Sequence, residues 1–305
     1  QQRVRHIHFD TAVFTNLQRD HLDFHHTFEN YFAAKKKLFE ELLSPQNTKP
    51  YKTAVINADD PYGRQLIDML KGKVRLLTYG LETQADYRAS AIEESLHGTK
   101  FTVNGLPGQI RLLGRHNVYN ALAALCIAKA NGVQEKDALA GLAELAGVPG
   151  RMERIDGGQD FFVFVDFAYT DESLQRAYQT VKHFQKGRII TVFGCGGDRD
   201  RTKRPLMGRT ACQNSDLVFL TNDNPRTEDP KQIFADIQKG MDGFSNYEVE
   251  PDRRAAIFKA INAARKDDIV IIAGKGHEQT QKIGHEVLPF SDQQTAREAV
   301  RGKHV

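Results

Sequence analysis

Residues 188–205 read RIITVFGCGGDRDRTKRP, in which an apolar, β-branched run is followed at once by a glycine-rich turn. Such a run is typical of a buried strand. Similar runs occur at 161–165, 217–221 and 269–273, and helical patterns lie between them. Alternation of buried strands with helices predicts an α/β fold built on a parallel, doubly wound sheet.

Polar or glycine-rich residues follow each of these four predicted strands. They are Asp166, Gly194–Arg204, Asp223–Arg226 and Gly274–Glu278. In doubly wound sheets, ligands bind outside the carboxyl ends of the strands. A single loop of this kind would be read as an ordinary polar turn, but four together predict one binding site.

The first half of the chain mixes helices with short strands. The expected strands are 11–15 and 53–57, with further short strands between 73 and 113, and the expected helices are 27–43, one starting at Asp60-Pro61, 117–131 and 135–146. A stiff proline stands beside a permissive glycine in Val148-Pro149-Gly150, which favours a domain boundary there. We therefore predict domains at 1–148 and 149–305.

The composition excludes several classes of protein. The 305 residues carry a net charge of +3 from 42 basic and 39 acidic side chains, which argues against a nucleic-acid partner. The longest apolar runs are far shorter than the ~20 residues of a membrane span. No CxxC pair is present, so the three cysteines are read as apolar core residues and the cytoplasm is the expected compartment. The chain begins with Gln1 and has no signal segment, which favours an internal part of a longer chain.

The segment Asp20–His26 and the helix after it form a candidate metal site. The segment holds three histidines and two aspartates, which can bind a divalent cation or form a solvated loop. Lys35 lies midway along an apolar stripe of the following helix. The stripe consists of Phe28, Phe32, Phe39 and Leu42. A lysine aimed at a core is costly unless it is paired, modified or snorkelling, and the residues alone leave these alternatives open.

Three loops of the second half suggest ligand contacts. Gly194–Pro205 lacks the spacing of a dinucleotide fingerprint or a P-loop, but its glycines let backbone amides approach an anion. Pro225 stiffens the loop near Arg226, whose guanidinium suits a carboxylate, while Asp223 suits an ammonium group. Together they describe a receptor for an amino-acid head group, or else an internal ion pair that shapes the turn. Glu278 can bind an amine.

Taken together, eight segments resemble the Mur ligase family, and within it the ligases that add diaminopimelate. The segments are Asn16–Asp23 (NLQRDHLD), Ala33–Lys35, Asn57–Pro61 (NADDP), Gly114–Ala124 (GRHNVYNALAA), Val148–Arg154 (VPGRMER), Phe193–Met207 (FGCGGDRDRTKRPLM), Asp223–Pro230 (DNPRTEDP) and Gly274–Glu278 (GKGHE). The resemblance implies that 1–148 is the rear portion of a central ATPase domain. It also implies that 149–305 is a Rossmann-like domain that binds the incoming amino acid.

The resemblance implies an ATP-dependent, peptide-bond-forming ligase of cytoplasmic peptidoglycan synthesis. ATP would phosphorylate the D-glutamate carboxylate of UDP-MurNAc-L-Ala-D-Glu, and the amine of meso-diaminopimelate would attack the acyl phosphate. Because the reacting groups are anions that repel, Mg²⁺ is expected to bridge them. The implied partners are these small molecules, with no nucleic acid or membrane, and a monomer is expected.

The resemblance also assigns roles to residues. It implies that His21 ligates Mg²⁺ and that Lys35 is carbamylated beside the metal. Asn120 and Arg151 would contact the adenine nucleotide and Asp166 its ribose. The residues that would hold the diamino acid are Arg204, Asp223, Asn224, Arg226, Gly274 and Glu278.

Some features depart from the family pattern. The P-loop, the uridine-binding domain and a metal-binding glutamate are absent from these residues, so no turnover is expected from the chain alone. Tyr169 stands where the family commonly has histidine, and Asp171 where it has proline. The alternatives are a lysine-adding ligase, a non-catalytic amino-acid-binding module and a ligase that adds glutamate to folate. Arg226 favours a substrate with a second carboxylate, because a site group left unpaired penalises the wrong substrate.

Overall fold

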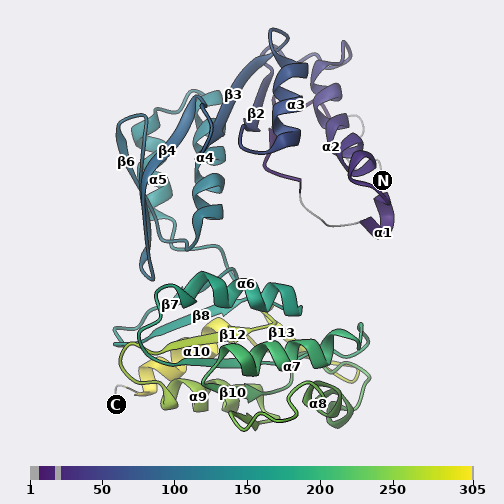
Figure 1. The fold of residues 1–305 in the computed structure, drawn as a ribbon, viewed down its shortest axis with the longest axis vertical. Helices are drawn as coiled ribbons and strands as arrows, with labels where there is room; N and C mark the ends of the chain where they lie inside the picture. Colours follow the sequence, from purple (N-terminus) through teal and green to yellow (C-terminus); the bar gives the residue numbers. More distant parts are fainter. Residues whose placement is uncertain (1–6, 18–21, 304–305) are drawn as a thin grey trace. The chain divides into compact units, whose positions relative to one another are not determined.

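The computed structural model describes residues 7–17 and 22–303. The chain divides into two compact units, Gln1–Ala146 and Gly147–Val305 (Figure 1). Both are mixed α/β, which confirms the predicted fold class. Within the described ranges, no helix combines the length and the apolar character that crossing a membrane requires.

The first unit is built on a sheet in the order β1-β2-β3-β4-β5-β6. The strands β1 to β4 pair in parallel, and β4, β5 and β6 pair antiparallel. The strands are β1 (Thr11–Phe14), β2 (Thr53–Asn57), β3 (Arg75–Gly80), β4 (Tyr87–Ser95), β5 (Gly98–Val103) and β6 (Leu106–Ile110). The helices are α1 (Leu22–His25), α2 (Phe28–Leu43), α3 (Pro61–Leu70), α4 (Arg115–Ala130) and α5 (Glu135–Glu144).

Successive side chains of β2 point to opposite faces of the sheet, so the core of this unit is divided between the two faces. Ala54 and Ile56 pack in a cluster with α2 and α3, while Val55 packs in another with α4 and α5. The predicted starts of α2 and α3 are confirmed, whereas α4 begins at Arg115, two residues before the predicted start. Thr27 caps α2 through the Asn30 amide, and Asp60 caps α3 with proline at the first helical position.

The second unit has the sheet order β11-β10-β9-β12-β8-β7. Its strands are β7 (Glu153–Ile155), β8 (Phe162–Asp166), β9 (Ile189–Phe193), β10 (Leu217–Leu220), β11 (Tyr247–Val249) and β12 (Ile269–Ala273). All pair in parallel except the edge strand β7. The helices are α6 (Asp171–Lys182), α7 (Lys203–Asn214), α8 (Pro230–Gln238), α9 (Arg253–Ala263) and α10 (Asp292–Lys303). The doubly wound sheet is therefore as predicted.

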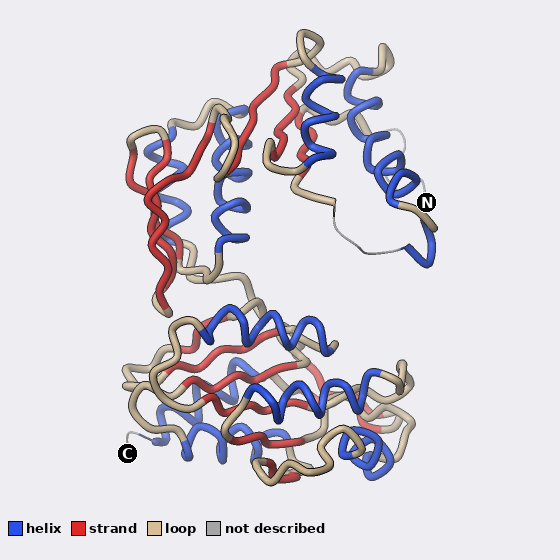
Figure 2. Tube along the Cα trace, viewed as in Figure 1, coloured by secondary structure: helices blue, strands red, loops and turns tan. Residues whose placement is uncertain are grey.

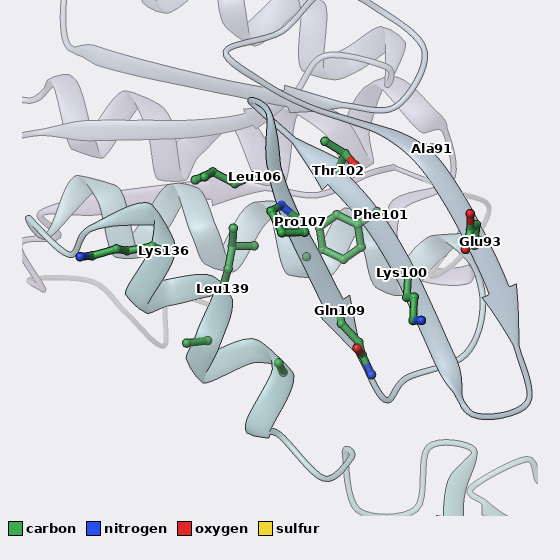
Figure 3. A pocket seen from close by; sticks show the side chains of 13 residues that line it. Ala91, Glu93, Lys100, Phe101, Thr102, Leu106, Pro107, Gln109, Lys136 and Leu139 are labelled. Carbon is green, nitrogen blue, oxygen red and sulfur yellow. The ribbon is translucent and has the colours of Figure 1, made fainter.

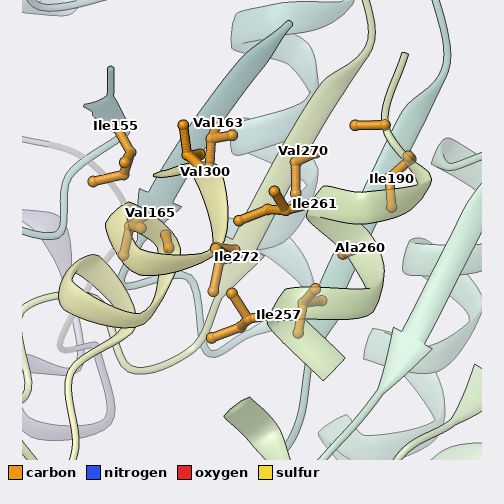
Figure 4. Packing of buried hydrophobic residues seen from close by; sticks show 14 of the residues in the cluster. Ile155, Val163, Val165, Ile190, Ile257, Ala260, Ile261, Val270, Ile272 and Val300 are labelled. Carbon is orange, nitrogen blue, oxygen red and sulfur yellow. The ribbon is translucent and has the colours of Figure 1, made fainter. Parts of the chain in front are cut away.

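Helices cover both faces of this sheet (Figure 2). On one face α9 and α10 bury a cluster that includes Val163, Val165, Ile190, Ile261 and Ile272 (Figure 4). Every residue of β12 is buried, which fits the continuous apolar run of a central parallel strand. Full burial of each such side chain contributes roughly 1.5–3 kcal/mol. A hairpin of β13 (Thr280–Ile283) and β14 (Glu286–Pro289) follows β12 and was not predicted.

Candidate functional site

The loops after β8, β9, β10 and β12 converge at one edge of the second sheet. The Gly274 amide donates to the Asp166 carbonyl at 3.1 Å, and the Gly197 amide donates to the Asn224 carbonyl at 2.9 Å. A hydrogen bond from Lys275 Nζ to Asn224 Oδ1 links these two pairs, so all four predicted segments are connected. The predicted convergence is therefore confirmed, and it follows from the parallel register of the strands.

Close packing between the loops explains their glycines. A Cβ atom on Gly194 would lie 2.1 Å from the Thr221 carbonyl oxygen, and one on Gly197 would lie 1.9 Å from that of Pro225. The space beside both glycines is thus filled by the neighbouring loop. These two glycines serve loop packing, and the approach of their backbone amides to an anion stays a prediction.

Asp223 is the buried carboxylate of this site. Its side chain lies against Gly274, whose φ is +116° and whose added Cβ would be 2.6 Å from Asp223 Oδ2. Burial raises the pKa of the Asp223 carboxyl, and the charges of Arg253 and Lys275 oppose that rise. Among the described ion pairs, none joins Asp223 to Arg226. The alternative of an internal pair that shapes the turn is therefore wrong.

Arg226 is held in position by its backbone. Its φ of +52° lies in the left-handed region that side chains other than glycine rarely adopt. Its amide donates to the Lys282 carbonyl, and its carbonyl accepts from the Gly284 amide, so the β13–β14 hairpin fixes it. The guanidinium donates to the Gly197 carbonyl at 2.7 Å, and no ion pair with a described acidic side chain neutralises it. Its charge is therefore available to a ligand.

Glu278 belongs to a network around Lys275. The Lys275 Nζ donates to Asn224 Oδ1, Glu278 Oε2 and the Thr280 carbonyl at 3.0, 2.8 and 2.8 Å. Asn224 Nδ2 also donates to Glu278 Oε2 at 2.8 Å. Burial alone would raise the pKa of Glu278. The hydrogen bonds from Lys275 and Asn224 outweigh this effect and hold the pKa below its ordinary value. Glu278 is consequently ionised at neutral pH.

The prediction for Arg204 does not fit this geometry. Arg204 is fully buried, and its guanidinium donates to both oxygens of Glu228 at 3.0 Å and to Asp236 at 3.1 Å. Arg204 Nε has no hydrogen-bond partner among the described residues, but full burial of the side chain leaves no exposed face for a ligand. Arg204 anchors the loop, because Glu228 also accepts a hydrogen bond from the Asp198 amide.

Arg199 of the same loop is a residue that sequence reasoning missed. It is exposed, and its guanidinium donates to the neighbouring Asp198 carbonyl at 3.1 Å. A Cβ on Gly196 would lie 2.8 Å from Arg226 Nη1 and 3.8 Å from Arg199 Cγ, so both arginines border Gly196. The sequence signal was an arginine inside the glycine-rich turn, GGDRD, whereas Arg204 stands in the helix that follows.

Asp166 and Arg151 both lie in the second unit, and the charge of Arg151 acts on the Asp166 carboxyl. Asp166 Oδ2 accepts from the Met152 amide at 2.6 Å. Burial raises the pKa of Asp166, while that hydrogen bond and the Arg151 charge oppose the rise. The exposed Arg151 lies over the Phe167 ring at 5.7 Å. Asn120 lies in the first unit, on the exposed side of α4, and donates to Asn117 Oδ1 at 3.0 Å.

The candidate metal residues are placed only in part. His21 lies outside the described residues. The apolar stripe of α2 is confirmed, but Lys35 is half-buried, with its Nζ 5.1 Å from the centre of the Tyr31 ring. Its amine thus lies against an aromatic ring of the same helix. Across residues 7–17 and 22–303, no group of three or more His, Cys, Asp or Glu side chains is arranged to hold a metal ion. The Mg²⁺ assignment stays a prediction.

The departures at Tyr169 and Asp171 have structural explanations. Tyr169 is exposed, and Lys203 at the start of α7 donates to its carbonyl at 2.7 Å and lies over its ring at 4.9 Å. Asp171 is the first residue of α6, after a capping box formed by Thr170 and Ser173. Both proline and an acidic residue suit that position, so the replacement preserves the helix start.

A separate cavity lies in the first unit. It measures about 660 Å³ and lies between β4, β5, β6 and α5, where Phe101, Leu106, Pro107 and Leu139 line it (Figure 3). None of the predicted site residues lines this cavity.

Two family models match the chain in order along the sequence. The Mur ligase middle domain matches residues 1–128, and the Mur ligase, glutamate ligase domain, matches residues 150–276. The UDP-N-acetylmuramoyl-L-alanyl-D-glutamate–2,6-diaminopimelate ligase of Syntrophomonas wolfei subsp. wolfei is 45% identical over 99% of this chain and 62% of its own length. A protein of the same name from Solibacter usitatus is 46% identical over 98% and 60%.

A comparison with solved structures also finds a ligase of this name. A structure of a UDP-N-acetylmuramoyl-L-alanyl-D-glutamate–2,6-diaminopimelate ligase superimposes with a TM-score of 0.72 at 38% identity, covering 99% of this chain and 62% of that one. The chain therefore spans about 62% of the length of the relatives it matches.

Proposed function

Because the chain belongs to the Mur ligase family, we propose that it is part of an ATP-dependent ligase of peptidoglycan precursor synthesis. The ligase joins meso-diaminopimelate to UDP-MurNAc-L-Ala-D-Glu. In this proposal, residues 1–148 serve ATP and Mg²⁺, and residues 149–305 bind the incoming amino acid. The curated relatives support diaminopimelate as that amino acid and do not favour a folate ligase.

The observation that carries the proposal is the charge pattern at the converging loops. Asp223 and Glu278 offer carboxylates, and Arg226 offers a guanidinium without an acidic partner among the described residues. The carboxylates suit an ammonium group, and the guanidinium suits a carboxylate by paired hydrogen bonds. A diamino dicarboxylic acid supplies both groups at its far end while its other amine remains free to react.

The residues of the chain position this amine for attack on an acyl phosphate. Asp223, Asn224, Arg226, Gly274 and Glu278 hold the diamino acid. We replace Arg204 by Arg199 in this set, because Arg199 is the exposed arginine beside Gly196. Fixing the amine in one orientation removes much of the entropic barrier to its reaction.

The nucleotide and metal roles rest on the family resemblance. Asn120 and Arg151 would contact ATP, and Asp166 its ribose. His21 and a carbamylated Lys35 would hold Mg²⁺, which neutralises the phosphate oxygens when bound. The three cysteines are buried and unpaired, which supports the proposed cytoplasmic location. We also expect a monomer.

Calorimetric titration of the chain with meso-diaminopimelate and with L-lysine tests the proposal. We expect diaminopimelate to bind at least about tenfold more tightly, since lysine leaves Arg226 unpaired. Equal affinities would favour the lysine-adding alternative. If neither diaminopimelate nor lysine binds, the proposal is contradicted. Phosphate release is expected only when a P-loop is supplied, because residues 1–305 contain no such pattern. Diaminopimelate-dependent release from the chain alone would contradict that expectation.

A further inference from the structure

We propose that Lys275 is a positioning residue of the amino-acid site, whose buried ammonium locks the Asn224 amide and the Glu278 carboxylate into the arrangement that receives an ammonium group of the ligand. The inference rests on the proposed function and extends it to a side chain that does not itself contact the ligand.

Lys275 cannot serve as a ligand contact, because its hydrogen-bonding capacity is used up inside the protein. Its side chain is fully buried, in the loop after β12. An ammonium group has three N–H donors, and Nζ has three acceptors at 2.8 to 3.0 Å, namely Asn224 Oδ1, Glu278 Oε2 and the Thr280 carbonyl. Because all three N–H groups of Lys275 are bonded to protein acceptors, Lys275 can influence a ligand only through the side chains that it holds.

Asn224 is held in one orientation by this contact. Its Oδ1 accepts from Lys275 Nζ and from the Lys282 amide at 2.9 Å, while its Nδ2 donates to Glu278 Oε2. Turning the amide over would place its NH₂ group against two donors. Lys275 thereby connects the loop after β10 to the loop after β12 and to the β13–β14 hairpin.

Glu278 is left with one oxygen for the ligand. Oε2 accepts from both Lys275 and Asn224, whereas Oε1 accepts no hydrogen bond within the described residues. The side chain is 34% exposed. The carboxylate is thus anchored through one oxygen and presents the other, which is the arrangement that a site for an ammonium group requires.

The charges around Glu278 show why the lysine matters. Arg226 and Asp223 face it from the loop after β10, and Arg253 acts on it from α9. Arg253 is already paired with Asp292. A charged Asp223 opposes ionisation of Glu278, so Lys275, the buried cation bonded to Glu278, favours the charged form of Glu278. Without it, burial and the repulsion between like charges would favour protonation of one of them.

The test uses Lys275→Gln, which keeps a donor but removes the charge, and Lys275→Met, which removes both. Lys266→Met is the matched control, because Lys266 is an exposed loop lysine of the same unit. Carboxyl NMR titration measures the pKa of Glu278 in each protein without any ligand. Calorimetry then measures meso-diaminopimelate affinity at about pH 6 and about pH 8. Circular dichroism melting verifies that each variant is folded, and the glutamine variant serves if the methionine variant does not fold.

We expect the Glu278 pKa to rise in the folded Lys275 variant and not in the control. Diaminopimelate affinity should fall at least about tenfold at pH 8 and further at pH 6, while the wild-type affinity stays nearly constant. A folded variant with an unchanged Glu278 pKa, or with unchanged affinity, would overturn the inference. If the wild type binds no diaminopimelate, the proposed function fails, and the NMR titration still decides whether Lys275 controls Glu278.

Discussion

The loops at the carboxyl edge of the second sheet and the candidate metal and nucleotide residues of the first unit differ in how they are held. Asn224, Arg226 and Glu278 are fixed by backbone and side-chain bonds that cross three loops and a hairpin. The Asp223 carbonyl accepts from Gln281 of that hairpin. By contrast, Lys35 contacts a ring one turn away and Asn120 bonds one turn back. The preorganised charges at the second sheet indicate a binding site from the structure alone. The roles of Lys35 and Asn120, which make only local contacts, rest on the family resemblance.

Loss of Arg204 should produce the largest effect on this framework. Arg204→Ala would leave Glu228 and Asp236 without their buried partner, and breaking a buried ion pair from one side costs about 3–5 kcal/mol. Urea unfolding monitored by circular dichroism measures the loss. The control Arg176→Ala removes an exposed pair and should change stability little. A fully stable Arg204→Ala variant that has lost only ligand affinity would restore Arg204 as a ligand contact.

Gly197→Ala should push the loop after β9 away from the loop after β10. Its Cβ would lie 1.9 Å from the Pro225 carbonyl oxygen, so the segment carrying Arg226 must move. We expect diaminopimelate affinity to fall at least about tenfold, together with a lower melting temperature. Gly302→Ala is the control, because its Cβ would meet no atom within 4 Å and helical alanine is favoured. Wild-type affinity in Gly197→Ala would show that the packing of these loops does not set the site.

Asp223→Asn should change protein stability and ligand affinity in opposite directions at neutral pH. Burial raises the pKa of Asp223, so between the ordinary pKa and the raised one the folded protein holds a proton that the unfolded chain releases. This residue's contribution to stability therefore falls as pH rises through that range. The variant should therefore be more stable than the wild type at neutral pH but not at about pH 3, while losing diaminopimelate affinity. Urea unfolding at both pH values measures the difference. A variant that is less stable at neutral pH would indicate that Asp223 is paired in the folded state.

Tyr169→His should have the smallest effect. Lys203 is bonded to the backbone carbonyl at this position, so that contact survives, and the lost cation–π contact is worth about 0.5–1 kcal/mol. Thermal melting should shift slightly and diaminopimelate affinity should stay the same. A large change in affinity would extend the site to the loop after β8.

Much of this fold could be predicted, for identifiable reasons. Continuous apolar runs marked the strands β8, β9, β10 and β12, and parallel topology then required their following loops to meet. The hairpin β13–β14 was missed because its strands are short and largely exposed, so no hydrophobic pattern marks them.

The roles of the charged residues in the site are hard to predict from sequence for one common reason. Arg204 and Arg199 lie in one basic run, and sequence alone does not tell which guanidinium is buried against Glu228 and Asp236. Lys275 was passed over because its partners, Asn224 and Thr280, come from separate segments. Long-range partners decide the role of a charged side chain, and local sequence does not show them.

The most direct test of the amino-acid site is the ratio of meso-diaminopimelate to L-lysine affinity in wild type and Arg226→Lys, measured by calorimetry. Because a lysine ammonium cannot reproduce the paired hydrogen bonds of a guanidinium, we expect diaminopimelate affinity to fall at least about tenfold and L-lysine affinity to stay nearly the same, so the ratio collapses. An unchanged ratio, or equal loss for both ligands, would contradict the assignment of Arg226 to the second carboxylate.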